Sequence, residues 1–270
     1  MPDDCKSCMS ERAYTAEDIR VLHRDAELLV LWKPAGLPTT SPDGRGCLTE
    51  LAAQLDPSAP RLHASSRLDA EVTGIVTFAR TTRAIEGLLE ARRTGRYERY
   101  YLGIATGAPE PARGELRWAI DRDPRDARKR VALPPPAAGK KARGQEALTL
   151  YRTLQLLPTA ALLLLSPQTG RTHQLRVHIA KAGFPLLGDR HYGGPTQCTL
   201  ANGRVLRAGR VMLHCARVRL PQLAGASALT RLARLTIDAP IPDDMQTLWA
   251  GLGGEPEQLL HALDAQSDQS

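Results

Sequence analysis

The chain has 270 residues, of which 42% are hydrophobic and 24% are charged, proportions that are typical of globular proteins. Its most apolar stretch, Ala160 to Leu165, is far shorter than the roughly 20 residues that cross a bilayer, which excludes a membrane-spanning helix. The formal net charge of +7 favours a polyanionic partner, because basic side chains that neutralise phosphates release condensed counterions.

Both ends of the chain are expected to be tails. Residues 1–16 are polar and lack the charged-then-apolar layout of a secretion signal. Cys5 and Cys8 form a CxxC pattern there, but no second cysteine or histidine pair follows at zinc-finger spacing, so we expect no metal site. The five cysteines are scattered, which indicates reduced thiols in a cytoplasmic protein. Residues 255–270 are expected to form the C-terminal tail, although they contain a short apolar stretch.

The body of the chain, residues 17–254, is expected to be one domain, since no repeat or low-complexity linker divides it. Apolar segments bounded by turn residues predict strands. In chain order these are Leu28 to Trp32, Gly74 to Phe78, Tyr100 to Ala105, Leu148 to Leu154, Ala161 to Leu165 and Val211 to Leu220.

Two segments predict helices. The first begins with Thr82 as its N-cap and ends at Gly95, and the second runs from His173 to Ala182 with Thr172 as its N-cap. Strands therefore outnumber helices and follow one another without regular helical crossovers. This pattern favours an α+β fold with a mainly antiparallel sheet over a doubly wound fold.

The most basic stretch, Arg125 to Arg143, predicts a surface loop, because its LPPPAAG segment cannot form a regular helix or a central strand. It holds seven basic side chains and one acid, Asp126. It is either a solvated loop or a cationic arm that grips phosphates. The basic balance of the whole chain favours the arm.

The sequence contains no P-loop, GxGxxG turn, GxSxG elbow or HExxH helix. Its polar residues instead gather in two clusters, SRLDAEVTG from Ser66 to Gly74 and GRTHQLRVH from Gly170 to His178. Asp69 stands in a loop before a predicted strand, where a nucleophile or base would be held rigidly. An arginine of the second cluster could keep it ionised; the alternative is an Arg–Asp pair that only ties the loop to the helix.

The second cluster contains two histidines that suggest acid–base or metal chemistry. His173 and His178 are five residues apart and would point to different faces of a helix, which argues against shared ligation. We expect both to be hydrogen-bonded structural residues. Arg171, Thr172 and Gln174 are expected to brace the start of the helix and its loop.

At these residues the chain resembles the RluA-type pseudouridine synthases. That family shows HRLDxxTSG around its catalytic aspartate, and a later motif close to GRTHQLRVHxAxxGxPLLGDxxYG, which residues Gly170 to Gly193 match almost completely. Trp32 to Leu37 resembles the family's NKPxGL segment, and Arg99 to Leu102 resembles its KxY strand. Four motifs in family order imply an RNA pseudouridine synthase, with an α+β catalytic domain built on an extended mixed sheet flanked by helices.

The resemblance also implies roles for four residues. Asp69 matches the catalytic aspartate, Tyr101 the active-site tyrosine, and Arg176 the arginine that pairs with the aspartate. Arg67 matches a residue that the family places near the position left by the target base. Enzymes of this family need no metal and no organic cofactor, so none is expected.

Three positions around Asp69 depart from the family pattern: Ser66 stands for histidine, Val72 for threonine and Thr73 for serine. They leave open an alternative, a catalytically inactive RNA-binding protein on the same scaffold. A carboxylate enzyme acting on a free nucleoside or glycoside is a second alternative, which the basic segment disfavours.

The expected substrate is a stem-loop of ribosomal RNA or transfer RNA, because single-stranded loops present bases that a protein can read. Too few residues precede Val21 for the small S4-type RNA-binding module that some relatives carry. The choice of target is therefore expected to come from the catalytic domain itself. We expect a monomer without an obligate protein partner.

Overall fold

The computed structural model describes residues 13–59, 62–134, 143–223, 234–261 and 263. The strands are β1 (Arg20–Arg24), β2 (Leu28–Lys33), β3 (His63–Ala64), β4 (Thr73–Ala79), β5 (Glu98–Ala105), β6 (Arg113–Leu116), β7 (Ala119–Arg122), β8 (Arg130–Leu133), β9 (Thr149–Leu157), β10 (Ala160–Pro167), β11 (Gln197–Thr199), β12 (Val205–Arg207), β13 (Leu213–Pro221) and β14 (Arg234–Asp238). The helices are α1 (Leu48–Leu55), α2 (Thr82–Arg93), α3 (Gln174–Lys181), α4 (Asp243–Gly251) and α5 (Pro256–His261), with 3-10 turns η1 (Ala16–Asp18) and η2 (Arg190–Tyr192).

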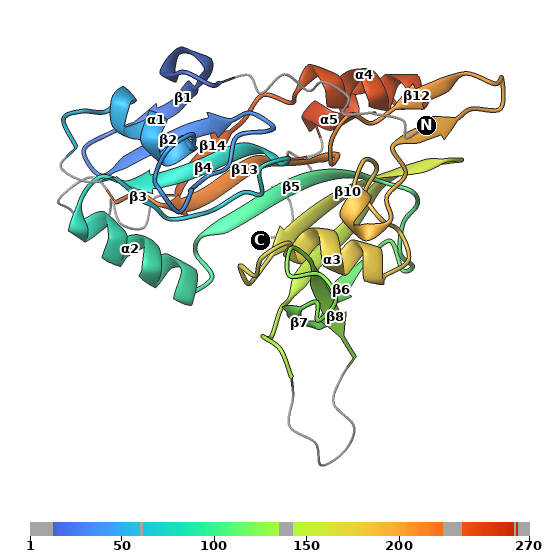
Figure 1. Ribbon diagram of the computed structural model, residues 1–270, viewed down its shortest axis with the longest axis horizontal. Coiled ribbons are helices and arrows are strands. Elements are labelled where there is room, and N and C mark those ends of the chain that lie inside the picture. The colour runs from blue at the N-terminus through green and yellow to red at the C-terminus, as the bar shows by residue number, and fades with distance from the viewer. Residues whose placement is uncertain (1–12, 60–61, 135–142, 224–233, 262, 264–270) are drawn as a thin grey trace, which may run out of the picture.

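Within these described ranges, ten strands form one extended sheet (Figure 1). Its order is β1-β2-β4-β13-β5-β10-β9-β6, with β3 paired to β4 and β14 paired to β13. The pairs are antiparallel except for β4 and β13, which run parallel. The hairpins β7–β8 and β11–β12 form separate two-stranded sheets. The expected α+β class, with a mixed and mainly antiparallel sheet, is confirmed.

The strand β10 is buried on both faces and separates two apolar clusters. Successive strand side chains point to opposite faces, so Leu163 and Leu165 pack in one cluster with α2 and α3, whereas Leu162 and Leu164 pack in the other with Trp249 of α4. Figure 1 accordingly shows α2 and α3 on one side of the sheet and α4 and α5 on the other. Burial on both faces explains why the sequence of β10 is a continuous apolar run rather than an alternating one.

The parallel contact between β4 and β13 requires a glycine. Gly74 has a φ of +117°, and a Cβ at this position would lie 2.3 Å from the carbonyl oxygen of Cys215. Any side chain would therefore push the two strands apart at the point where β4 leaves the loop that carries Asp69. The glycine that closes the SRLDAEVTG cluster thus sets the distance between the loop and β13.

All six predicted strands are present, most of them one to three residues longer than predicted. Both predicted helices are present, but their N-caps were wrong. The cap of α2 is Thr81, whose Oγ1 accepts the backbone N–H of Ala84 at 3.0 Å. The cap position of α3 is His173 in a left-handed conformation, and no side chain caps this helix.

The predicted loop from Arg125 to Arg143 is wrong in part, because Arg130–Leu133 form β8 and pair with β7. Lys140 and Lys141 lie outside the described residues, as do Cys5 and Cys8. The segment expected as a C-terminal tail contains α5, whose Leu259 is buried, and no helix among the described residues is long and apolar enough to cross a membrane.

Candidate active site

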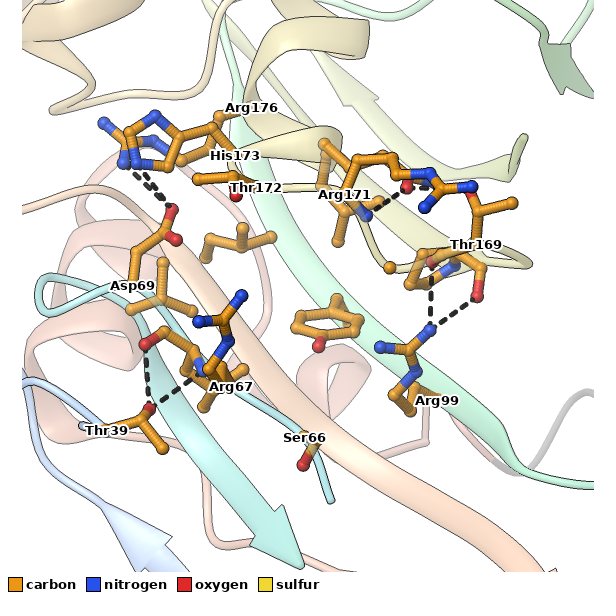
Figure 2. A pocket seen from close by; sticks show the side chains of 18 of the residues that line it. Thr39, Ser66, Arg67, Asp69, Arg99, Thr169, Arg171, Thr172, His173 and Arg176 are labelled. Carbon is orange, nitrogen blue, oxygen red and sulfur yellow. Dashed lines mark hydrogen bonds and ion pairs between the residues drawn. The ribbon is translucent and has the colours of Figure 1, made fainter. Parts of the chain in front are cut away.

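A cavity of about 550 Å³ opens where the loop before β4, the middle of β5 and the start of α3 meet. All four residues that the sequence predicts for the site, Arg67, Asp69, Tyr101 and Arg176, line this cavity. Figure 2 labels Arg67, Asp69 and Arg176 among them. The structure therefore brings together residues that are up to 109 positions apart in the chain (176 − 67). The volume lies within the range of sites that enclose a ligand of nucleotide size.

Asp69 is held in a loop whose backbone is tied down on both sides. The hydroxyl of Thr39 donates to the carbonyl of Leu68 at 2.9 Å and accepts the N–H of Leu68 at 3.0 Å. On the other side, the N–H of Val72 donates to the carbonyl of Asp69, and the N–H of Gly36 donates to that of Ala70. The side chain of Asp69 keeps 24% of its surface exposed. It is thus a rigidly mounted carboxylate that a substrate can reach.

Lys33 lies beneath this loop and is completely buried. Its ammonium donates to the carbonyls of Pro34, Leu37 and Ala70 at 2.7–2.9 Å. Burial lowers the pKa of Lys33 to about 7, whereas the charge of Asp69 acts in the opposite direction. Three acceptors use all three N–H groups of the charged form, so Lys33 joins the WKPAGL segment to the residue that follows Asp69.

Arg176 of α3 links two carboxylates. Its Nη1 donates to Oδ2 of Asp69 at 3.0 Å, while Nε and Nη2 donate to the two oxygens of Asp189 at 2.8 and 2.7 Å. Burial works against the charge of Arg176, but the hydrogen bonds and charge of Asp189, with those of Asp69, raise its pKa above the usual value. The arginine therefore stays positive and presents one N–H group to Asp69.

Asp189 was not predicted as a site residue, although it lies in the quoted GDxxYG part of the second motif. Its side chain is almost fully buried, at 1% exposure, and contacts the equally buried Arg176. A buried charge needs a partner to offset desolvation. The signal that could have found Asp189 is that it is the single acid between Gly170 and Gly193, a motif that contains Arg176 and three other basic residues.

Tyr101 lies in β5 with only 5% of its surface exposed and contributes to the lining of the cavity. Burial, and then the neighbouring thiol of Cys215, raise its pKa well above the usual value. Its phenol is therefore neutral at physiological pH. The position combines an apolar ring with a hydroxyl inside the cavity.

Arg67 lies beside Asp69 on the rim of the cavity and is exposed (Figure 2). Four further arginines, which the sequence did not predict as site residues, also line it: Arg92, Arg99, Arg130 and Arg171. Arg99 donates from Nη2 to the carbonyls of Pro167 and Thr169, which orients it across the cavity wall. The rim is therefore strongly positive.

The two histidines of the second motif differ from each other. His178 is fully buried, and its ring nitrogens contact Oγ1 of Thr149 and the carbonyl of Trp118, so its structural role is confirmed. His173 instead lines the cavity, and its Nε2 lies 3.8 Å from Oδ2 of Asp69. The predicted hydrogen bonding of His173 is confirmed, since its Nδ1 lies 2.7 Å from Oη of Tyr192, but the prediction did not place the residue in the cavity.

The predicted bracing group Gln174 holds the loop before α3. Its Oε1 accepts hydrogen bonds from the hydroxyl of Thr169 and the backbone N–H of Arg171, and its Nε2 donates to the carbonyl of Leu148.

Among the described residues, no cluster of three or more His, Cys, Asp or Glu side chains could hold a metal ion. The functional groups of the cavity are thus a carboxylate, a phenol, an imidazole and several guanidiniums.

Comparisons with known proteins agree on one family. The family described as RNA pseudouridylate synthase matches residues 27–181. The ribosomal large subunit pseudouridine synthase D of Nitrosomonas europaea is 31% identical over 254 residues, which cover 92% of this chain and 70% of the relative. The same enzyme of Xylella fastidiosa is 34% identical over 242 residues, which cover 86% of this chain and 69% of the relative. Human RNA pseudouridylate synthase domain containing 4 superposes with a TM-score of 0.65 at 28% identity, over 86% of this chain and 92% of that one.

Proposed function

This chain belongs to the RNA pseudouridylate synthase family and is an RNA pseudouridine synthase, and we propose that Asp69 is its catalytic carboxylate. The observation that carries this proposal is the hydrogen bond from Arg176 to Asp69 in a cavity lined by Tyr101. A carboxylate that is oriented by a buried arginine, and is still reachable, suits a nucleophile or a base.

The reaction breaks the bond between the ribose and N1 of uracil, turns the ring, and joins the same ribose carbon to C5, from which a proton then leaves. Asp69 acts at the ribose carbon, either by forming a covalent intermediate or as a base close to it. The neutral phenol of Tyr101 lies against the uracil ring. Its hydroxyl assists the loss of the C5 proton, directly or through a water molecule.

The target uridine must leave the RNA stack to reach a carboxylate inside a cavity, at a cost of a few kcal/mol. We propose that Arg67 occupies the space that the base leaves, since its guanidinium is planar, exposed and free of hydrogen bonds to the described residues. The other arginines of the rim hold the phosphates on either side of the flipped nucleotide.

The named relatives act on the large ribosomal subunit, and we propose a uridine in a ribosomal RNA stem-loop as the substrate, with transfer RNA as the second candidate. We propose further that the chain works in the cytoplasm as a monomer, without a metal or organic cofactor. Activity in the presence of EDTA and a monomeric mass in size-exclusion chromatography with light scattering are the expected results.

The decisive assay follows release of tritium from RNA that carries [5-³H]uridine, with ribosomal and transfer RNA pools assayed separately. The wild type is expected to release tritium from the ribosomal pool, and Asp69→Asn is expected to release none while binding RNA normally. The control is Asp43→Asn, a carboxylate change at an exposed residue outside the cavity. Equal release by Asp69→Asn and the wild type would exclude Asp69 as the catalytic group. Salt-sensitive RNA binding by the wild type without release would instead support the inactive RNA-binding protein.

A further inference from the structure

His173 has a backbone conformation that its residue type rarely adopts. Its φ of 57° and ψ of 18° are left-handed, and no other described residue except glycines has a positive φ. This conformation is strained for a residue that has a Cβ atom. Strained residues of this kind gather at functional sites, where the surrounding structure holds them in place.

A chain of hydrogen bonds connects the ring of His173 to Tyr192 and to the backbone of Arg130. The backbone N–H of Arg130 donates to Oη of Tyr192 at 2.9 Å, and Oη lies 2.7 Å from Nδ1 of His173. With Oη accepting the first bond, its own hydrogen is available to Nδ1, and in this arrangement Nδ1 is the acceptor and the ring hydrogen is on Nε2. Burial raises the pKa of Tyr192 to about 12, so its hydroxyl keeps the proton that it donates.

The imidazole is neutral in this environment. Burial lowers the pKa of His173; Asp69 and Asp189 oppose this effect, while Arg176 and Arg130 add to it. A neutral ring with its hydrogen on Nε2 turns that hydrogen toward Asp69, since Nε2 lies 3.8 Å from Oδ2. This separation is longer than a hydrogen bond, but catalytic contacts commonly shorten when the substrate binds.

Both donors that face Asp69 approach the same oxygen. Arg176 Nη1 and His173 Nε2 lie 3.0 and 3.8 Å from Oδ2, and in Figure 2 both dashed lines end on one oxygen of the carboxylate. We propose that His173 is a positioning residue that, together with Arg176, binds Oδ2 of Asp69 and so leaves Oδ1 as the oxygen that acts on the ribose. This inference rests on the proposed catalytic role of Asp69.

The test uses His173→Gly, because glycine accepts the left-handed backbone and removes only the imidazole. We expect the single-turnover rate at saturating enzyme to fall about 10- to 100-fold, the range for a slightly misplaced reacting group, while the affinity for RNA changes less than about twofold. The matched control is His191→Asn, an exposed histidine whose ring centroid lies 6.4 Å from that of His173. It should react at the wild-type rate.

Chemical rescue separates positioning from a merely structural role. Free imidazole can accept from Tyr192 and donate to Asp69, whereas 1-methylimidazole can accept but has no N–H to donate. Imidazole is expected to restore the rate of His173→Gly at least severalfold and 1-methylimidazole is not. Tyr192→Phe, which removes the hydroxyl that fixes the ring, is expected to lower the same rate at unchanged RNA affinity.

Two results would overturn the inference. One is a His173→Gly enzyme that reacts at the wild-type rate. The other is a slow His173→Gly enzyme whose rate imidazole does not restore and whose affinity for RNA is also reduced. The loss would then come from the fold of the loop. Both results leave the role of Asp69 intact as long as the wild type releases tritium and Asp69→Asn does not. If Asp69→Asn is active, the proposed function fails first, and the two failures are thereby distinguished.

Discussion

The guanidinium of Arg176 forms two parallel hydrogen bonds to the carboxylate of Asp189, from Nε at 2.8 Å and from Nη2 at 2.7 Å. This fork fixes the plane of the guanidinium and thereby the directions of the two N–H groups on the remaining nitrogen, Nη1. One of them donates to Oδ2 of Asp69 at 3.0 Å. A structural ion pair thus sets the geometry of the proposed catalytic carboxylate.

Arg176→Lys tests this geometry. An ammonium keeps the positive charge but cannot donate two parallel bonds to Asp189 and a third to Asp69 from one plane. We expect the single-turnover rate to fall at least about 10-fold, and the free energy of unfolding to fall by about 1.5–3 kcal/mol, as for a lost charged hydrogen bond. Tritium release and urea unfolding measure the two effects. A lysine variant with the wild-type rate would show that the bidentate contact has no part in the reaction.

Gly74→Ala tests the close approach of β4 and β13. The new Cβ would lie 2.3 Å from the carbonyl oxygen of Cys215, so the strands must separate. We expect a loss of more than about 3 kcal/mol in the free energy of unfolding. Gly183→Ala is the matched control, because its φ is +95° but nothing lies within 4 Å of the added carbon. It should lose only about 1–2 kcal/mol, the cost of the left-handed backbone. Similar losses in urea unfolding would contradict the proposed steric cause.

His214 makes the stability of the protein depend on pH. It is fully buried, with Nδ1 2.8 Å from the hydroxyl of Thr73, and burial lowers its pKa to about 3 from the usual 6.5. Between these values the unfolded chain binds a proton that the folded protein does not. The free energy of unfolding should therefore fall as the pH falls below about 6.5, by up to about 1.4 kcal/mol per pH unit from this group.

Urea unfolding of the wild type and of His214→Asn, from pH 7.5 to pH 5, measures this contribution. The variant lacks the titrating group, so the stability advantage of the wild type should shrink as the pH is lowered through 6.5. A difference between the two proteins that stays constant over this range would show that His214 is not neutral in the folded state.

The hairpin β7–β8 carries the described part of the basic segment, and we expect it to contact RNA phosphates. Arg125 and Arg128 are exposed there, and Arg128 forms an ion pair with Asp126 at 3.0 Å. Ion pairs of such exposed arginines are weak. Replacing both arginines by serine should reduce the slope of log K against log salt by about 0.7 per lost phosphate contact. The rate at saturating enzyme should not change. Filter binding from 50 to 300 mM salt, roughly the range in which such contacts are screened, provides the measurement.

The matched control replaces Arg20 and Arg83 by serine. Both are exposed, and they lie on β1 and at the start of α2, away from the hairpin in Figure 1. This pair removes the same charge from the protein, so an equal change in slope would assign the effect to net charge rather than to the hairpin.

Six of the fourteen described strands and two of the five described helices could be predicted, because their signals are local. The apolar run of β10 and the Thr81–Thr82 start of α2 are visible in a few consecutive residues. Helices α1 and α4 were not predicted, because Cys47 and Pro242, which precede them, are not residues that typically cap a helix. The parallel pairing of Gly74 with Cys215 was also missed, because it joins residues 141 positions apart (215 − 74) that share no pattern.

At the site, the sequence predicted the members better than their contacts. The resemblance brought Asp69, Tyr101 and Arg176 to one place, and the cavity contains all three. The roles of Asp189 and His173 could not be derived. The role of Asp189 follows only from the burial of Arg176. The prediction for His173 assumed a helical backbone, whereas His173 has a left-handed conformation at the N-cap position of α3.

The strand β13 pairs with both β4 and β5, so the sheet around the cavity is complete only after β13 has been synthesised. The cavity uses Leu213 as part of its lining, and the loop of Asp69 enters a strand that packs on Cys215. When about the first two hundred residues have left the ribosome, roughly three quarters of the chain, all four family motifs have been synthesised but β13 has not. The cavity is then incomplete. We therefore expect activity to appear only after β13, which lies between β4 and β5 in the sheet, has been synthesised.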